Sequence, residues 1–379
     1  MFVIRPAKPD DLDTLLKLAK MVYFINLPPD RDIISEKIRR SRRSFEGEIL
    51  HGAARGKPGP RKGLATESPL FMFVLEDPET GNALGTSQVV ARMGSPGNPN
   101  LALRLRKREF FSKDLQNGTT HVTAQLVLDE SGPTEIGGLI LQPSYRGHKA
   151  KLGKQLALVR FHFIALHRKL FGDRVLAEMM APISADGRNE FWEAFGRRFI
   201  NLSYEEADRF CQNSREFMTS LLPREEIYLS LLTAEARRVV AEVNVETVPA
   251  RRMLEQIGFR YHDMIDPFDG GPHLECPTDE ISIVKATNTR TLLGAADEKA
   301  PGFGGEAIVS VDGKNASSEE FRAVCCGFSE DGVGGSVRIP AAAIELLGAR
   351  ENATVGFTVL KAPGEKKGDH SKRPVGASA

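Results

Sequence analysis

The chain has 379 residues and a formal net charge of +1, so it is long enough for two domains and carries no global charge that would favour nucleic acid or an acidic membrane surface. Its four cysteines show no metal-binding spacing, and no apolar run of about 18 residues predicts a membrane span. Because the first residues lead straight into a short strand, no signal peptide is expected. These features predict a cytoplasmic protein without a metal site.

The N-terminal segment predicts a short strand followed by two helices. Phe2–Arg5 is mostly apolar and predicts a strand at the edge of a sheet. Pro9–Asp11 provides an acidic helix start, and leucines recur at helical spacing from Leu12 onward. A second, strongly charged helix is expected near Ile33–Phe45. The stretch of about 50–68 is rich in Gly, Pro and Lys, and we predict a flexible surface insertion there.

The next segments predict an antiparallel meander. Residues 71–75 and 83–92 are strands joined by the turn Asp77–Gly81, and 94–100 is a second loop. Residues 120–128 alternate polar and apolar side chains, which predicts the following strand. We expect the apolar run 136–141 to complete this meander.

The stretch from Glu135 to Leu170 predicts a strand, a basic loop and an amphipathic helix in that order. The free N–H groups and the dipole at a helix start form an anion site, and a pyrophosphate would fit it. A basic, solvated helix start without a ligand is the alternative interpretation. The residues expected to bind the anion are Arg146, Gly147, Gly153 and Lys154.

Beyond this helix, the pattern again mixes strands and helices. Arg174–Met179 predicts a buried strand, and Tyr204–Arg238 is mostly helical. Val239–Val243 is rich in valine and predicts a strand that ends at Asn244. Ile281–Val284 predicts the last strand of this part of the chain.

The composition changes near residue 290. A Gly-, Ala- and Pro-containing linker is expected at 291–306, after a first domain of residues 1–290. Residues 307–361 predict a small β-rich domain around one short helix at Ala341–Leu347. The Lys-, Gly- and Pro-rich residues 362–379 predict a disordered tail.

Residues 1–288 together resemble the arginine N-succinyltransferases, a branch of the GNAT acyltransferase superfamily. The resemblance is carried by FVLEDPETG from Phe73, EIGGLILQP from Glu135, FWEAFGRRF from Phe191 and PARRMLEQIGFRY with IDPFDGGPHLEC from Pro249. The last motif is specific, because the DGGP loop after GFRY is not a general GNAT feature. The basic loop before the long helix also resembles the loop with which GNAT enzymes hold the pyrophosphate of coenzyme A.

The resemblance implies an α+β fold with a GNAT-like acyltransferase domain and a small β-rich C-terminal domain. It implies transfer of succinyl from succinyl-CoA, a co-substrate rather than a permanently bound cofactor, to the α-amine of L-arginine in arginine catabolism. Leu139 and Leu141 lie on the strand where the family binds acyl-CoA, and the backbone of Leu139 could stabilise an oxyanion. Small-molecule partners are implied, with no nucleic acid or membrane, and an oligomer with itself or with a homologous subunit.

The chain departs from the family at the catalytic position. Asn244 stands where the family has a histidine proton donor, and an asparagine cannot act as a general acid. His262 is the next candidate, whereas Cys211 on an apolar helix face is better explained as a core residue. Two alternatives therefore stay open: an acyl-CoA transferase for a different amine, and a weakened paralogue that serves as a non-catalytic or regulatory subunit.

Overall fold

The computed structural model describes residues 1–21, 27–47, 68–184, 187–211, 214–313, 320–331 and 335–363. The predicted insertion and the predicted tail lie almost entirely outside these residues. Helices and strands are mixed along the chain, which confirms the α+β class at that level. Among the helices described, none is long and apolar enough to cross a membrane.

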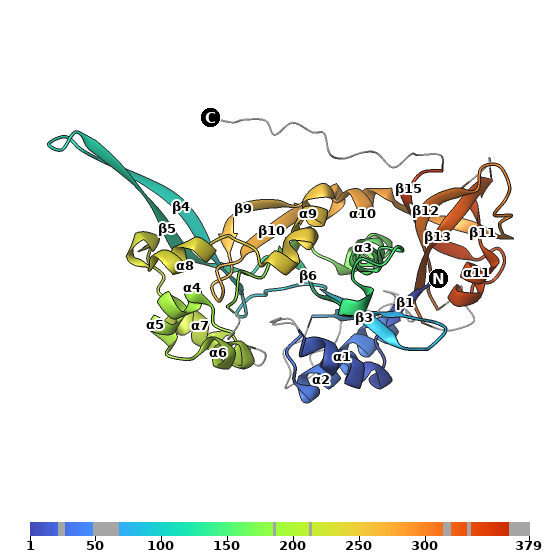
Figure 1. Ribbon diagram of the computed structural model, residues 1–379, viewed down its shortest axis with the longest axis horizontal. Helices are drawn as coiled ribbons and strands as arrows, with labels where there is room; N and C mark the ends of the chain where they lie inside the picture. The colour runs from blue at the N-terminus through green and yellow to red at the C-terminus, as the bar shows by residue number, and fades with distance from the viewer. Residues whose placement is uncertain are drawn as a thin grey trace.

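One 15-stranded sheet runs through the molecule (Figure 1), in the order β12-β15-β11-β14-β13-β1-β2-β3-β6-β7-β10-β9-β4-β5-β8. The strands are β1 (Val3–Pro6), β2 (Leu70–Glu76), β3 (Ala83–Val90), β4 (Asn100–Ser112), β5 (Asn117–Asp129), β6 (Thr134–Leu141), β7 (Arg174–Glu178), β8 (Ile227–Tyr228), β9 (Arg260–Ile265), β10 (Pro272–Pro277), β11 (Thr287–Ala295), β12 (Gly304–Val311), β13 (Arg322–Asp331), β14 (Ser336–Ile339) and β15 (Thr354–Lys361).

Helices cover both faces of the central strands. Figure 1 shows α3, α9 and α10 on one face and α1, α2 and α4–α7 on the other. The helices are α1 (Leu12–Ala19), α2 (Arg31–Phe45), α3 (Leu152–Leu166), α4 (Glu190–Ala194), α5 (Gly196–Ile200), α6 (Tyr204–Cys211), α7 (Glu216–Leu221), α8 (Ala234–Val239), α9 (Val248–Gln256), α10 (Ser282–Ala286) and α11 (Ala341–Leu347).

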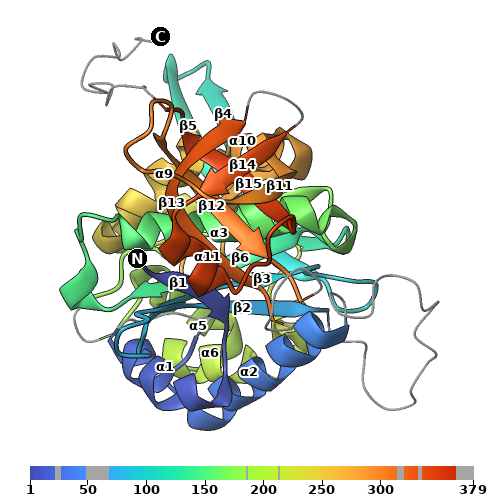
Figure 2. The same ribbon diagram turned by 90° about the vertical axis from the view of Figure 1, so that its right-hand side faces the viewer.

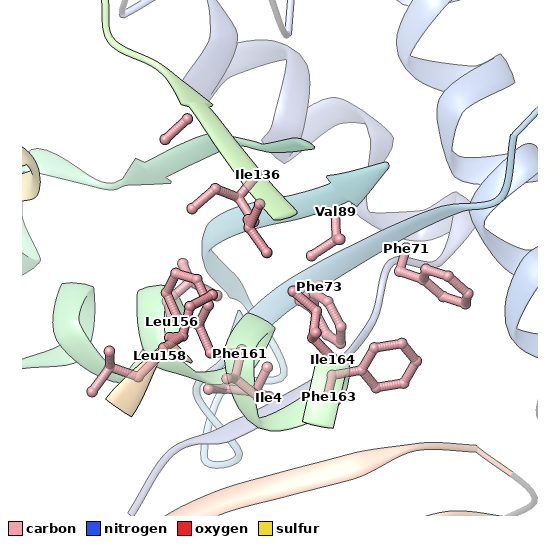
Figure 3. Packing of buried hydrophobic residues seen from close by; sticks show 14 of the residues in the cluster. Ile4, Phe71, Phe73, Val89, Ile136, Leu156, Leu158, Phe161, Phe163 and Ile164 are labelled. Atoms are coloured by element: carbon pink, nitrogen blue, oxygen red, sulfur yellow. The ribbon is translucent and has the colours of Figure 1, made fainter. Parts of the chain in front are cut away.

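The continuous apolar sequence of β2 follows from this double coverage. Successive side chains of a strand point to opposite faces, so a strand that is buried on both faces needs apolar residues throughout. Phe71 and Phe73 pack into one core cluster with Phe163 of α3 (Figure 3), whereas Met72 and Val74 pack with α1 and α2. All four β2 side chains are at most 1% exposed.

The prediction that the first strand lies at an edge is wrong. β1 pairs with β2 on one side, where Ile4 faces Leu75, and with β13 on the other, where Val3 faces Val324. The second partner comes from more than 300 residues along the chain, so no local sequence pattern could indicate it.

The predicted meander is also wrong in one part. β6 pairs with β3, not with β5. β4 and β5 instead form a long hairpin, paired from Asn100 with Asp129 to Ser112 with Asn117, and Figure 1 shows its far half projecting from the body of the molecule. β4 was missed because its outer half is dominated by charged side chains, which are not typical of a buried strand.

The C-terminal strands form a closed circuit of pairings. β12 pairs with β15, β15 with β11, β11 with β14, β14 with β13, and β13 again with β12. Figure 2 shows these strands gathered around a common centre, where Val309, Phe328 and Phe357 are buried. The small β-rich unit and the helix Ala341–Leu347 were therefore predicted correctly as elements.

Residues 281–306, which join the first part of the chain to the C-terminal strands, differ from the prediction. Ile281–Val284 is not a strand, because α10 begins at Ser282. The predicted linker at 291–306 contains the second half of β11 and the start of β12, so the strands of the C-terminal circuit begin at Thr287. Division into domains of residues 1–290 and 307–361 stays a prediction.

Candidate functional site

β6 and β7 form a V-shaped opening in the centre of the sheet. These parallel strands pair only through Thr134 with Val175 and Glu135 with Leu176, after which β6 continues along β3 and β7 along β10. The pairing of β6 with β3 shifts register beyond Gly137, and Gly138 has a positive φ of 55°. Beyond Glu135, no strand among the described residues pairs with this edge of β6, and an unpaired edge of this kind can accept an extended ligand.

The candidate acyl-CoA residues lie along this opening. Leu139 and Leu141 follow the bulge on β6 and are half-buried beside the core cluster of α3. Stabilisation of an oxyanion by the Leu139 backbone N–H stays a prediction.

The basic loop connects β6 to the N-terminus of α3, as predicted. Gly147 and Lys151 have positive φ values of 76° and 51°, which turn the chain so that α3 begins at Leu152. Gly153 and Lys154 lie in the first helical turn, and the Lys154 N–H donates a 2.9 Å hydrogen bond to the Lys151 carbonyl at the helix cap. The exposed Arg146 guanidinium lies 3.6 Å from the Glu246 carboxylate, which links the loop to the segment that contains Asn244. Pyrophosphate binding by this loop stays a prediction.

Asn244 is not at the end of a strand. α8 ends at Val239, and Ala241 has a positive φ of 61°, so the predicted strand Val239–Val243 is absent. The Thr233 side chain caps the start of α8, and Val239 is the last residue of that helix. The Asn244 Oδ1 accepts a 3.0 Å hydrogen bond from the Glu246 N–H, as a cap of the following short helix.

The backbone nevertheless places Asn244 beside the opening. Its N–H donates a 2.8 Å hydrogen bond to the Met180 carbonyl, just past the end of β7. The predicted strand end at Asn244 is therefore wrong, but the chain still brings the Asn244 backbone against the residues that follow β7. A catalytic role for Asn244 stays a prediction.

His262 lies farther from the opening. It is on β9, and β10 separates β9 from β7. At about 4.8 Å per strand, the β9 backbone is roughly 10 Å from β7, too far for a direct contact between His262 and a thioester in the opening. His262 instead lines a cavity of about 320 Å³, together with His273 and Arg174.

A buried polar cluster, which the sequence interpretation missed, lies on the α2 face of the sheet. It consists of Glu178 at the end of β7, Asp266 after β9 and His273 on β10, and one side-chain ligand atom from each lies within 4.8 Å of the others. His273 Nε2 is 3.8 Å from Glu178 Oε1. The residues are far apart in the sequence, and only the DGGP motif next to two of them signalled an unusual loop.

The two acids of the cluster, Glu178 and Asp266, both interact electrostatically with one buried cation, Arg215. Asn100 donates a 3.3 Å hydrogen bond to Glu178 Oε1 and accepts one of 2.7 Å from Arg215. Burial raises the pKa of the Glu178 carboxyl and raises that of Asp266 well above its ordinary value. Burial also lowers the pKa of His273 to about 4, so this imidazole is neutral at pH 7. The arrangement suits a cationic ligand, and a divalent metal ion is one chemical possibility.

Cys211 does not have the surroundings of a nucleophile. Its Sγ is 3.7 Å from the sulfur of Met218, and burial raises the pKa of the thiol to about 12. Because only the thiolate is nucleophilic, Cys211 is a core residue.

Three similarities identify the family. A family model described as "Arginine N-succinyltransferase beta subunit" matches residues 2–283. The arginine N-succinyltransferases of Enterobacter sp. (strain 638) and Citrobacter koseri are 32% and 33% identical over 327 residues, covering 86% of this chain and 88% of each relative. The solved structure of arginine/ornithine succinyltransferase subunit AI from Pseudomonas aeruginosa superposes with a TM-score of 0.76 at 25% identity, over 95% of this chain and 98% of that one. This chain therefore belongs to the arginine N-succinyltransferase family.

Proposed function

We propose that this chain transfers the succinyl group of succinyl-CoA to the α-amine of L-arginine. The observation that carries the proposal is the position of the acidic cluster, at the end of the same β7 strand that borders the opening. An acyl-CoA along the β6 edge and a cationic amino acid on the α2 face would meet at this point. The GNAT-like arrangement of strand, basic loop and helix supports acyl-CoA as the donor, and a cytoplasmic location stays a prediction.

The reaction needs few protein groups. The neutral amine nitrogen attacks the thioester carbon, the carbonyl oxygen becomes an oxyanion, and collapse of this intermediate breaks the C–S bond. The amine loses one proton, and the departing thiolate can take up one proton from water. The Leu139 N–H would stabilise the oxyanion, while the basic loop would hold the pyrophosphate.

Asn244 cannot supply the proton, but a thiol leaves readily without one because its pKa is about 8.5. We therefore expect an active enzyme that lacks the contribution of a general acid, about 10²- to 10⁴-fold where it operates.

Glu178 and Asp266 would bind the guanidinium group of arginine. Glu178 is 15% exposed at its side chain and Asp266 is 8% exposed, so both carboxylates are largely removed from water. A guanidinium that presents planar N–H donors would replace the lost hydration with charge-assisted hydrogen bonds.

The test is thiol release from succinyl-CoA with L-arginine and with L-citrulline, whose side chain has nearly the same shape without the charge. We expect turnover with arginine and little with citrulline. Glu178→Gln should raise the KM for arginine by about 10- to 100-fold, as expected for a charged hydrogen bond. Glu226→Gln is the control, because Glu226 lies at the protein surface in ion pairs with Arg106 and Arg108. No release with arginine under any condition would overturn the proposal.

A second candidate function is that of a non-catalytic subunit in a hetero-oligomer. It is favoured by Asn244 at the family's histidine position and by exposed apolar side chains on the β4–β5 arm, where Phe111 is 65% and Leu115 is 78% exposed. Light scattering and activity of the chain alone, and then with a catalytically intact homologous subunit, distinguish the two functions. Activity that appears only in the mixture would favour this second candidate.

A further inference from the structure

Arg160 is a buried cation without an acidic partner. It lies on α3 and is 3% exposed. Its Nε donates a 3.0 Å hydrogen bond to the Ala157 carbonyl of the same helix, and its Nη1 donates one of 3.4 Å to the Gly137 carbonyl. Throughout the part of the chain that the structure describes, no carboxylate lies within ion-pair distance of this guanidinium. Burial alone lowers its pKa to about 9.

Such an arrangement is costly for a purely structural residue. A guanidinium has five N–H donors, and the two carbonyl contacts leave its other donors without a charged acceptor. Buried arginines are otherwise paired, because an unpaired charge removed from water is strongly unfavourable. In this chain Arg5 and Arg174 each contact two carboxylates. The difference indicates that Arg160 is placed for an anion that is not part of the chain.

The position of Arg160 suggests which anion. Gly137 lies just beyond the last residue of β6 that pairs with β7, so the Arg160 guanidinium reaches the apex of the V-shaped opening. Gly137 and Gly138 present no side chains there, and the Gln88 side chain lies against Gly138 at 3.1 Å from its ideal Cβ position. The polar groups of Arg160, Gly137 and Gln88 therefore meet at the apex, shortly before Leu139 in the chain.

We propose that Arg160 is an acyl-specificity residue, which binds the terminal carboxylate of a dicarboxylic acyl group carried by coenzyme A. This inference rests on the proposed function in one respect, the binding of acyl-CoA in the opening. In a succinyl group the carboxylate carbon is about 4 Å from the thioester carbon. A monocarboxylic acyl group would leave the cation unpaired.

The experiment measures binding to the full chain by isothermal titration calorimetry, with succinyl-CoA, butyryl-CoA and free CoA. Butyryl has the same number of acyl carbons as succinyl, with a methyl group in place of the carboxylate. The wild type should bind succinyl-CoA about 10- to 150-fold more tightly than butyryl-CoA, the range of a charged hydrogen bond. Arg160→Met should reduce this preference to within about 3-fold while leaving the affinity for free CoA unchanged. Arg160→Lys, which keeps the charge but loses the planar fork, should retain part of the preference.

Arg5→Met is the matched control, because Arg5 is equally buried but paired; it should lose stability and keep the preference. A wild type without a preference, an Arg160→Met protein that keeps it, or a folded Arg160→Met protein that no longer binds CoA would each overturn the inference. If Arg160→Met does not fold, the inference is tested with the wild type and Arg160→Lys. A lysine variant that keeps the full preference for succinyl-CoA over butyryl-CoA would contradict recognition by the guanidinium group. These measurements need no acceptor amine, so a failure to succinylate arginine would overturn the proposed function and leave this inference standing.

Discussion

Arg5 on β1 and Arg160 on α3 are buried to the same extent, at 3% exposure, but in opposite surroundings. Arg5 donates hydrogen bonds of 2.7 and 2.9 Å to the two oxygens of Asp11 and forms a second ion pair with Glu76. These carboxylates raise its pKa against the effect of burial, whereas burial alone lowers that of Arg160. A buried charge such as that of Arg5, whose partners are all residues of the chain, has a structural role. A charge whose partner is missing points to a ligand.

The same contrast separates two buried histidines. His162, two residues from Arg160, forms a 2.6 Å hydrogen bond with Thr358 and one of 2.7 Å with Ser310, so both ring nitrogens are satisfied within the fold. His273 Nε2, in the acidic cluster, has no hydrogen-bond partner among the residues described. His162 joins α3 to β15 and β12. His273 lies where we expect a substrate to bind.

The largest effect should come from breaking the paired arginine. Arg5→Met leaves the buried Asp11 and the partly exposed Glu76 without this cation, and should lower the free energy of unfolding by about 3–5 kcal/mol. Arg160→Met removes a charge that has no acid partner, and should cost less than about 2 kcal/mol. Urea denaturation of both variants measures the difference. Equal losses would mean that the two arginines have the same structural role.

The histidine junction should depend on pH. Burial lowers the pKa of His162 to about 3, below the unfolded value of 6.5, so the unfolded chain binds more protons between these values. His162 therefore contributes stability that is complete above pH 6.5 and is lost as the pH falls toward 3. Between pH 6.5 and 5 the loss is about 2 kcal/mol. His162→Gln should remove this part of the slope in urea denaturation across the range, and an identical slope in both proteins would contradict the assignment.

The smallest effect is expected at Asn244, whose side chain already has a partner in its own helix cap. Asn244→His should raise turnover about 10-fold and add a pH limb near 6.5, because a histidine beside the opening could protonate the leaving thiolate. Steady-state rates from pH 5.5 to 8.5 test this expectation, with Asn244→Ala as the comparison. If histidine and alanine behave alike in a folded protein, the proton donor lies elsewhere.

Local patterns predicted the parts of the site that are local in the chain. The order of strand, basic loop and helix follows from apolar spacing over a few turns and was predicted correctly, although the helix expected to reach about Leu170 ends at Leu166. The antiparallel hairpin of β2 and β3 follows in the same way from two apolar runs and a turn.

The parts that could not be predicted depend on pairing between distant segments. Asn100, Glu178 and His273 come from three strands that only the sheet order brings together. The unpaired state of Arg160 was equally hidden, because the sequence shows a basic residue on a helix and not what surrounds it. The valine-rich composition before Asn244 predicted a strand. In the structure, Val239 is instead the last residue of α8, a helix that Thr233 caps.

The pairing of β1 has a consequence for synthesis of the chain. The N-terminal strand is among the first segments to leave the ribosome, but its β13 partner is made more than 300 residues later. At about 5–20 residues per second, β1 waits at least roughly 15 seconds with one edge of its backbone unpaired. Exposed strand edges favour aggregation, so this interval is a period of vulnerability for the nascent chain. The central strand β1 can therefore gain its second partner only after Arg322–Asp331 has been synthesised.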